Sequence, residues 1–446
     1  MTRNQLWATL TVGSNPTLSA IKKDFPGFPR KSFLFFPAAI MMQKHKIYDV
    51  CVIGAGPAGS YLAMLLSRQQ LSVLLVEQSP LPRNKTCGGG LSAKTLQLLG
   101  LSPTALEARK ISGTYLAFKN QAIFYQEMPG AGYTVDRSHF DHCLARMAAD
   151  AGTTLMAPTA FQGYSREKTT ISIATSTGTA AARVLVGADG VFSRVRRQLF
   201  PGRKPHLAHA VQALAYPEKS GALLKHFSTR TWMDFGAVDK GYGWIFPRKN
   251  YFNIGLYKTA AATRNRSLRQ QLAAFAQGNP LLRNCRIEGI RGGALPLAVP
   301  GVDVCRGAIL LAGDAAGLCE SIFGEGIYYA LRSAQLAEKS IMAFFNGAAT
   351  LEKSYNRAIK KMSRELFFSR ILADIIYCHT RLTFDWLVTN EWVNRQFVDL
   401  IRGAQKHSTC LVKIAAGIPR WITAPRRQAT TPEKLFHQFG SPASPS

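Results

Sequence analysis

The chain has 446 residues, of which 47% are hydrophobic, enough to bury the cores of roughly two or three domains. Its 55 Lys and Arg residues against 26 Asp and Glu residues give a formal net charge of +29, which favours an anionic partner such as nucleic acid, a membrane surface or a phosphate-bearing cofactor or substrate. The basic residues are scattered singly, and no zinc-finger spacing or RNA-binding motif accompanies them, so nucleic acid is the weakest of these choices.

Cysteine usage and hydropathy indicate the compartment. The eight cysteines form no C-x-x-C pair and are spread over the whole length, which predicts reduced thiols in a cytoplasmic protein. No uninterrupted apolar run approaches the ~20 residues that cross a bilayer, so an integral membrane protein is not expected.

The first 41 residues are predicted to be a non-native extension. Residues 12–17 can be back-translated into the T-arm of a tRNA gene, with its loop and self-complementary stem. We therefore expect translation to begin at Met41 or Met42. A signal peptide over residues 32–42 is the alternative, but no small-residue cleavage site separates it from the first predicted strand.

A nucleotide-binding signature follows at residues 47–59, which read I-Y-D-V-C-V-I-G-A-G-P-A-G. The apolar run predicts a buried parallel strand, and the glycines predict a tight turn, a close approach of the backbone to a pyrophosphate, and a helix whose N-terminal amides face phosphate. The chance alternative is a glycine turn without a ligand. The residues predicted to contact the cofactor here are Gly54, Gly56, Pro57, Ala58 and Gly59.

A second strand is predicted over residues 71–76 and ends in Glu77. An acid at this place accepts hydrogen bonds from the adenosine ribose hydroxyls, and it repels a 2′-phosphate. The site is therefore predicted to bind FAD or NAD in preference to NADP.

Two later segments favour FAD. Residues 183–190 form a predicted strand that runs into Asp189 and Gly190, and residues 309–317 form another that ends in Gly313 and Asp314. They resemble the A-D-G and G-D motifs of the p-hydroxybenzoate-hydroxylase-like flavoproteins. The resemblance implies that Asp314 hydrogen-bonds the ribityl chain of FAD.

A glycine-rich helix start follows at residues 321–327. Gly324 and Gly326 are predicted to let the backbone pass close to the isoalloxazine, and the helix beginning at Ile327 to direct its positive end at the ring. A helix N-terminus stabilises negative charge, here that of reduced flavin, by about 0.3–1 kcal/mol. The alternative is a glycine-rich helix start with no ligand.

Two further motifs narrow the family. Residues 82–92 read P-R-N-K-T-C-G-G-G-L-S, and residues 242–248 read Y-G-W-I-F-P-R. Together they resemble the geranylgeranyl reductase family, whose marks are K-x-C-G-G and Y-x-W-x-F-P-K, over residues 48–347. The chain departs from this pattern at Arg248, where the family has lysine; arginine keeps the positive charge but changes the hydrogen-bond geometry.

The resemblance implies an FAD-dependent oxidoreductase that reduces isolated carbon–carbon double bonds in polyprenyl chains, of a lipid or a diphosphate. It also implies cofactor contacts for Lys85, Gly88, Gly89 and Arg137. For Arg137, which lies near the start of a helix predicted over residues 135–151, the alternative is a solvated or capping role. The electron donor is expected to be NADPH or a reduced ferredoxin, because no second glycine signature lies between a strand and a helix.

The predicted catalytic residues are Cys87, Tyr242 and Trp244. The resemblance places Cys87 near the reactive face of the ring, as proton donor or gate, whereas the alternative is a small buried hydrophobic residue. Tyr242, Trp244 and Phe246 alternate along one strand, so they share a face and form an aromatic wall for a polyprenyl chain. The alternative there is an ordinary core strand.

No metal site is predicted. His139 and His142, with the adjacent Cys143, lie on one helix, but Cys143 turns toward its apolar side and no fourth ligand is evident.

The expected fold is α/β: a Rossmann-type FAD-binding domain over residues 46–200 and 301–345, an antiparallel β-sheet substrate domain over 201–300, and a helical C-terminal region over 346–446. Leu411 to Arg427 combines apolar, tryptophan and basic residues, which suits contact with the inner face of a membrane, but packing of the segment on the protein body is the favoured alternative. The rival functions are a flavin-dependent aromatic hydroxylase of the same superfamily and a non-enzymatic flavin-bearing membrane-binding or redox-sensing protein. Against a halogenase, residues 242–247 lack the W-x-W-x-I-P pattern of that group.

Overall fold

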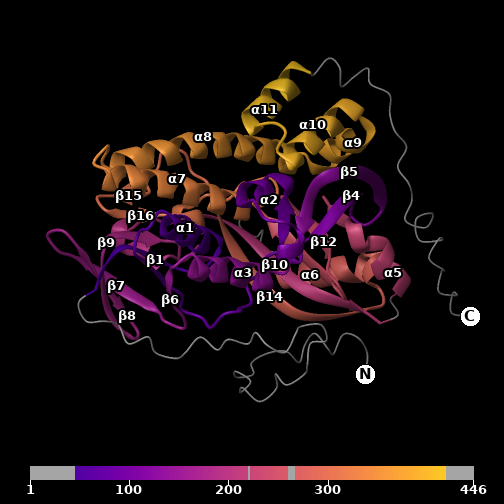
Figure 1. Ribbon diagram of the computed structural model, residues 1–446. Coiled ribbons are helices and arrows are strands. Elements are labelled where there is room, and N and C mark those ends of the chain that lie inside the picture. The colour runs from indigo at the N-terminus through magenta and orange to yellow at the C-terminus, as the bar shows by residue number, and fades with distance from the viewer. Residues whose placement is uncertain (1–45, 219–220, 260–266, 418–446) are drawn as a thin grey trace, which may run out of the picture. The chain divides into compact units, whose positions relative to one another are not determined.

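The computed structural model describes residues 46–218, 221–259 and 267–417, so the predictions for residues 1–41 and for the end of the 411–427 segment lie outside the described residues. Within these ranges the chain forms two eight-stranded sheets with helices packed against them (Figure 1). This confirms the predicted α/β fold with a helical C-terminal region.

The first sheet carries the nucleotide-binding signature. Its parallel core has the order β16 (Ile309–Leu311), β9 (Gly178–Gly187), β1 (Ile47–Ile53), β2 (Val73–Val76) and β6 (Thr154–Met156). The remaining strands are antiparallel: β15 (Cys305–Arg306) at one edge, and β7 (Phe161–Arg166) with β8 (Ile171–Thr175), which pairs with β9. The strands nearest the centre are nearly continuous apolar runs because both faces of a parallel sheet are covered.

Helices α1 (Pro57–Arg68) and α3 (Arg137–Asp150) pack against this sheet. Helix α1 also contacts α3 and α7 (Ile327–Phe345). The segment that closes the sheet, residues 309–345, comes more than 100 residues after β9 in the chain. The first sheet is thus assembled from separated stretches of the sequence.

The second sheet has the order β14 (Cys285–Leu297), β10 (His206–Pro217), β13 (Phe252–Lys258), β12 (Gly241–Pro247), β11 (Arg230–Asp234), β4 (Arg109–Phe118), β5 (Ala122–Thr134) and β3 (Gly90–Ser92). All neighbours are antiparallel except β11 and β4. The sheet therefore takes β3, β4 and β5 from residues 90–134, which the sequence analysis placed in the FAD-binding range. The reason is that these strands find their pairing partners in β11 and in each other, far from β1.

Shorter elements complete these two layers. The helices are α2 (Ala93–Leu99), α4 (Arg194–Leu199), α5 (Gly221–His226) and α6 (Leu268–Gly278), and the 3₁₀ turns are η1 (Thr104–Leu106), η2 (Phe227–Thr229), η3 (Pro280–Leu282) and η4 (Gly313–Ala316).

Up to residue 417, where the described part of the chain ends, four helices follow α7: α8 (Leu351–Cys378), α9 (Thr380–Thr389), α10 (Glu391–Arg402) and α11 (His407–Ala416). Figure 1 shows α8 running beside α7, with α9, α10 and α11 gathered next to β4 and β5. The C-terminal helices thereby reach from one sheet to the other. None of the described helices has the length and apolar character needed to span a membrane.

Candidate active site

A cavity of about 830 Å³ is lined by residues of both sheets and of the C-terminal helices. Its walls come from the ends of β1 and β2, the loop of residues 83–90, strands β10 to β13, and the loop of residues 319–326 before α7. Almost all residues singled out from the sequence meet here.

The glycine turn after β1 forms one end of the cavity. Gly54 has a φ of +102°, and a side chain on it would meet the carbonyl oxygen of Ala188 at 2.5 Å. Gly59 packs against the backbone of Gly54, which closes the turn and keeps Gly59 out of the cavity wall. By contrast, a side chain on Gly56 would meet only Arg83, at 3.7 Å. Gly56 is the N-cap of α1 and provides no side-chain cap, so the helix presents its first amides to the cavity.

A chain of charges runs along the same wall. The Glu77 carboxylate accepts hydrogen bonds from the amides of Ala55 and Ser79, at 2.9 and 3.0 Å. Arg83 bridges Glu77 and the buried Asp141, with nitrogen–oxygen distances of 3.4 and 3.1 Å. Glu77 is buried yet lines the cavity, as an acceptor for ribose hydroxyls requires.

Arg137 continues this chain of charges to Cys87. Its guanidinium makes two hydrogen bonds to Asp141, at 2.8 and 2.9 Å. Burial lowers the pKa of Arg137, but Asp141 and the thiol of Cys87 raise it by more, so its pKa lies above the usual value. Arg137 is therefore a fixed positive charge beside Cys87.

The A-D-G and G-D segments lie side by side. Arg196 donates hydrogen bonds to the carbonyl oxygens of Ala315 and Val191, which ties the two segments together. Asp189 accepts from the amides of Arg194 and Val195, while its second oxygen is buried without a hydrogen-bond partner among the described residues. Such an orphaned acceptor fits a polar ligand in the cavity.

The loop before α7 brings the N-terminus of this helix to the cavity. Gly324 has a φ of +68°, and Gly326 is the N-cap of α7 without a side-chain cap. Ile327, the first residue of α7, lines the cavity. The carboxylate of Glu325 accepts from Ser92 at 2.5 Å and pairs with Lys94 at 2.9 Å, which anchors this loop to β3 and α2.

The cysteine loop is held from the second sheet. The backbone amide of Cys87 donates a hydrogen bond to the side-chain oxygen Oε1 of Gln212 at 2.6 Å. The backbone carbonyl oxygen of Cys87 accepts one from the side-chain amide of Asn253 at 3.3 Å. Arg248 donates to the carbonyl oxygen of Gly88 at 2.6 Å. The Cys87 sulfur accepts from the amide of Gly89 at 3.3 Å. The loop is thus fastened through its backbone, which leaves the thiol facing Arg137.

The aromatic side chains of β12 share one face, as their alternation predicted. Tyr242, Trp244 and Phe246 all line the cavity, with successive ring centroids 6.2 and 6.3 Å apart. Tyr242 donates its hydroxyl to the carbonyl oxygen of Phe323 at 2.7 Å, and Trp244 donates to Asn253 at 2.8 Å. Burial, followed by Glu320 and nearby cysteines, raises the pKa of Tyr242. Both polar groups are satisfied by the protein, so what the strand offers the cavity is aromatic surface.

Aliphatic side chains also line the cavity. They include Ile111, Met128, Met233, Leu400 and Ile401. The last two belong to α10 and the first three to the second sheet, so this apolar part of the cavity (the chamber) is formed by a C-terminal helix together with the second sheet.

The cavity brings together most of the residues predicted from the sequence. The predicted cofactor contacts that line the cavity are Gly54, Gly56, Pro57, Ala58, Glu77, Lys85, Gly88, Gly89, Arg137, Asp189, Gly190, Asp314, Gly324, Gly326 and Ile327. The three predicted catalytic residues, Cys87, Tyr242 and Trp244, line it too. The other two predicted contacts, Gly59 and Gly313, do not line the cavity. Gly313 has a φ of +58°, and its amide donates a hydrogen bond to the hydroxyl of Ser333.

The histidine pair on α3 lies elsewhere. His139 Nε2 is 3.2 Å from the sulfur of Cys143. Within the part of the chain that the structure describes, no group of three or more His, Cys, Asp or Glu side chains is arranged to hold a metal ion.

Comparison with known proteins agrees with this geometry. The family described as FAD binding domain matches residues 47–367. The chain belongs to this family of FAD-binding proteins. The uncapped α1 terminus, the acid at Glu77 and the orphaned oxygen of Asp189 all fit FAD, which supplies redox chemistry when bound.

Individual relatives confirm the resemblance to geranylgeranyl reductases. An uncharacterized protein of Methanosarcina barkeri is 29% identical over 365 residues, covering 80% of this chain and 91% of the relative. The geranylgeranyl diphosphate reductase of Rhodobacter capsulatus is 27% identical over 318 residues, covering 70% and 79%. A geranylgeranyl bacteriochlorophyll reductase-like structure from Thermoplasma acidophilum shares the fold, with a TM-score of 0.69 at 21% identity over 88% of this chain and 99% of that one.

Sequence reasoning missed several residues of the site. Gln212 and Asn253 fasten the cysteine loop, and Asp141 joins two arginines. A signal for Asn253 exists in the sequence: a polar residue within the apolar strand of residues 252–257 needs a buried partner. Glu320 and His407 also line the cavity and had no signal, since their partners lie far away in the chain.

Proposed function

We propose that this protein reduces carbon–carbon double bonds of a polyprenyl lipid or diphosphate. Reduced FAD, when bound, supplies the hydride. The observation that carries the proposal is that one cavity is lined by the nucleotide-binding turn, by the aromatic face of β12 and by the apolar side chains of the chamber.

The chamber suits a hydrocarbon chain. Its walls are aromatic and aliphatic side chains, and the Tyr242 and Trp244 polar atoms are turned to protein partners. Burial of one methylene group contributes ~0.8 kcal/mol, so each five-carbon isoprene unit gains about 3–4 kcal/mol on leaving water. The tail can therefore provide most of the affinity, and a headgroup can be left to the basic residues of the rim.

The chain's own residues have distinct tasks in this proposal. Tyr242, Trp244 and Phe246 hold the chain and exclude water, and Cys87, which lines the same cavity beside Arg137, would act on the reactive side of the bound flavin. Arg248, Gln212 and Asn253 position the Cys87 loop.

The test is anaerobic. The flavin is reduced with dithionite, and a polyprenyl substrate is added. Reoxidation of the flavin is followed by absorbance, and the mass of the product is measured by mass spectrometry. We expect reoxidation together with a product heavier by two hydrogens per bond, and no reoxidation by the saturated analogue. Turnover only with oxygen and an aromatic substrate would instead identify an aromatic hydroxylase.

The electron donor is proposed to be NADPH or a reduced ferredoxin. Within the described residues, the glycine turn that joins a parallel strand to a helix lies between β1 and α1, and this turn is assigned to FAD. The electron donor is therefore expected to bind only transiently. Single-turnover reduction of the flavin by each candidate donor distinguishes the two.

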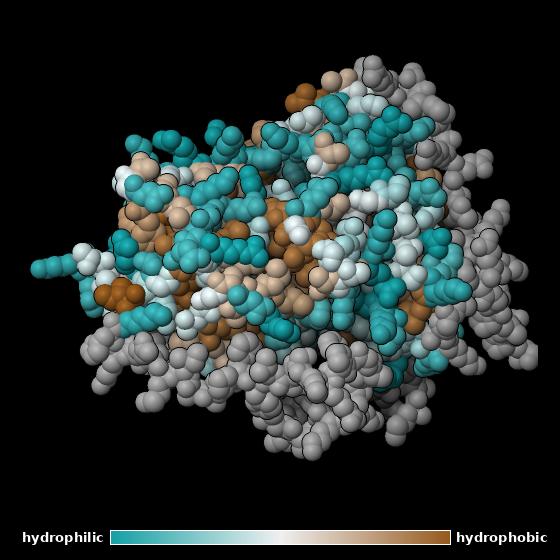
Figure 2. All heavy atoms as spheres, in the orientation of Figure 1, coloured by the Kyte–Doolittle hydropathy of each residue, from teal (hydrophilic) through white to brown (hydrophobic). Residues whose placement is uncertain are grey.

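A cytoplasmic protein that contacts the membrane face is the proposed setting, because polyprenyl substrates reside in bilayers. Val412 on α11 is 67% exposed, and Figure 2 shows hydrophobic atoms emerging at the α11 end of the molecule. Flotation with anionic vesicles, reversed by high salt, tests this contact. A chain ending at Ala404, which lacks α11, should float less; equal flotation of the two chains would place the contact on another surface.

A further inference from the structure

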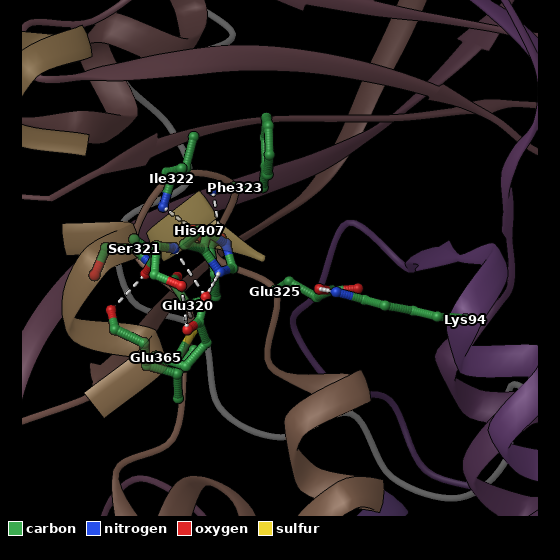
Figure 3. A network of polar contacts seen from close by, with 12 residues as sticks. Lys94, Glu320, Ser321, Ile322, Phe323, Glu325, Glu365 and His407 are labelled. Carbon is green, nitrogen blue, oxygen red and sulfur yellow. Dashed lines mark hydrogen bonds and ion pairs between the residues drawn. The ribbon is translucent and has the colours of Figure 1, made fainter. Parts of the chain in front are cut away.

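A buried histidine joins two carboxylates next to the cavity. His407 is the first residue of α11, Glu320 lies in the loop before α7, and Glu365 lies on α8. Figure 3 shows the imidazole between the two carboxylates. The Nε2 atom is 3.5 Å from Glu320 Oε1, and the Nδ1 atom is 3.9 Å from Glu365 Oε1. Each ring nitrogen therefore faces a different acid.

Glu320 is the inner member of this trio. It is 1% exposed, and its carboxylate accepts hydrogen bonds from the amides of Ile322 and Phe323, at 2.6 and 2.8 Å. Burial raises the pKa of Glu320, but His407 and the two amides lower it by more, so the group is a carboxylate at neutral pH. It lines the cavity together with His407.

Glu365 is the outer member. Its side chain is 28% exposed, and it accepts hydrogen bonds from the amide and the hydroxyl of Ser408, at 3.0 and 2.8 Å. A pair that served only to hold α11 in place would need one carboxylate. The second carboxylate, in contact with solvent, gives the imidazole a partner on each side: one toward water and one toward the cavity.

The neighbouring tyrosine hydroxyls are already engaged in hydrogen bonds to backbone carbonyl oxygens. Tyr242, Tyr257 and Tyr377 donate their hydroxyls to the carbonyl oxygens of Phe323, Ser321 and Ile322. Burial is the first cause of a raised pKa in all three and in Tyr329 of α7, which also faces Glu320 and Glu365. The nearest cation of the network, Lys94, is paired with Glu325. Among the described residues that line the cavity, His407 is the one histidine, the side chain that ordinarily gains and loses protons near neutral pH.

We propose that His407 is a relay residue, which passes protons from Glu365 at the surface to Glu320 at the cavity wall. The inference rests on the proposed function. Reduction of one double bond forms two carbon–hydrogen bonds: one takes the hydride with its electron pair, and the other takes a proton that must come from water. His407 releases its Nε2 proton toward Glu320 and the cavity, and its Nδ1 atom is reprotonated from the side of Glu365, which exchanges with solvent.

The first test needs no turnover. The variant His407→Gln keeps the approximate volume of the side chain and removes its ionisable ring. Infrared difference spectra at neutral pH should show a new protonated-carboxyl band in this variant, absent from the wild type and from the double variant with Glu320→Gln. Unchanged spectra in His407→Gln would overturn the coupling of the two groups.

The second test separates a relay from a structural pair. In anaerobic single turnover, His407→Gln and Glu365→Gln should slow flavin reoxidation by the polyprenyl substrate about 100-fold, the lower range of what positioned proton transfer contributes. The solvent isotope effect should rise and the pH profile should shift. Imidazole in the buffer should restore the rate of His407→Ala. The matched control, Glu338→Gln on α7, should behave as wild type.

The outcomes distinguish the two proposals. If the wild type reduces the substrate and both variants keep its rate, pH profile and isotope effect, the relay is wrong and the reductase remains. If the wild type fails to reduce any polyprenyl substrate, the proposed function is wrong, and the relay falls with it even when the infrared band appears.

Discussion

At the scale of single residues, Arg248 has a task that a lysine cannot copy in full. Its two terminal nitrogens donate to the carbonyl oxygens of Pro247 and Gly88, at 2.9 and 2.6 Å. A guanidinium spans two acceptors in a fixed plane, whereas an ammonium is a point donor. The arginine at this place therefore ties the end of β12 directly to the cysteine loop.

Asp314 is predicted to set the affinity for FAD. Replacing it with Ala removes a charged acceptor from the cavity wall, and losing a hydrogen bond to a charged group costs about 1.5–3 kcal/mol, roughly tenfold to hundredfold in affinity. We expect a folded, mostly colourless protein, measured by the flavin-to-protein absorbance ratio and by FAD titration. Asp303→Ala, at a half-exposed carboxylate, serves as the control. Full yellow occupancy of Asp314→Ala would contradict the assignment.

Cys87 is predicted to affect the reaction more than cofactor binding. Its thiol faces Arg137, while its loop is held by backbone contacts that Cys87→Ala leaves in place. Alkene reduction should therefore slow by more than FAD affinity falls, as measured by single turnover and titration of the same preparation. Equal losses would indicate a packing role, and an unchanged rate would remove Cys87 from the mechanism.

At the scale of elements, the shape of the cavity depends on close backbone contacts between the Cys87 loop and its neighbours, which leave no room for a side chain at Gly89. Gly89 has a φ of +67°, and a side chain on it would overlap the carbonyl oxygen of Val135 and the guanidinium of Arg248. The loop can therefore meet the start of α3 and the end of β12 only as glycine.

A matched pair of glycines tests this close approach. Gly130 on β5 has a φ of +73° but nothing within 4 Å of an added side chain. Both Gly89→Ala and Gly130→Ala carry backbone strain of about 1–2 kcal/mol, but only the first also displaces the loop. In urea unfolding we expect Gly89→Ala to lose more stability and to lose FAD. Equal losses from the two variants would show that the contact is loose.

At the scale of the whole molecule, the C-terminal helices complete the cavity instead of forming a separate body. Leu400 and Ile401 of α10 line the chamber, and His407 of α11 contacts the loop that precedes α7. The stability of this arrangement is expected to depend on pH through Glu320.

Glu320→Gln tests that dependence. Because the folded protein lowers the pKa of Glu320 from its ordinary 4.5, the carboxylate stabilises the fold above that pH, and its contribution is lost as the pH falls through the lower folded pKa. The difference in unfolding free energy between wild type and Glu320→Gln should therefore be largest at neutral pH and shrink below about pH 4.5. Chemical unfolding along a pH series measures it, with Glu338→Gln as control. A difference that stays constant into acid would contradict the pairing.

The sequence by itself determined the parts of the protein that depend on local chemistry. The glycines at residues 54–59 and the acid at Glu77 indicated a dinucleotide-binding fold because turns and helix termini impose residue types at fixed spacing. The resemblance of the segments that end in Asp189 and Asp314 to motifs of known flavoproteins then favoured FAD. Alternation along β12 predicted one aromatic face, because side chains two apart in a strand share a side.

The tertiary structure alone decided which distant segments meet. Strands β3 to β5 joined the second sheet, Asn253 and Gln212 fastened the Cys87 loop, and α10 and α11 closed the chamber. Glu320 and His407 lie 87 residues apart, so no spacing rule connects them. A buried carboxylate needs a counter-charge, but any histidine or arginine can provide it, and only the packing of α11 on α8 selects His407.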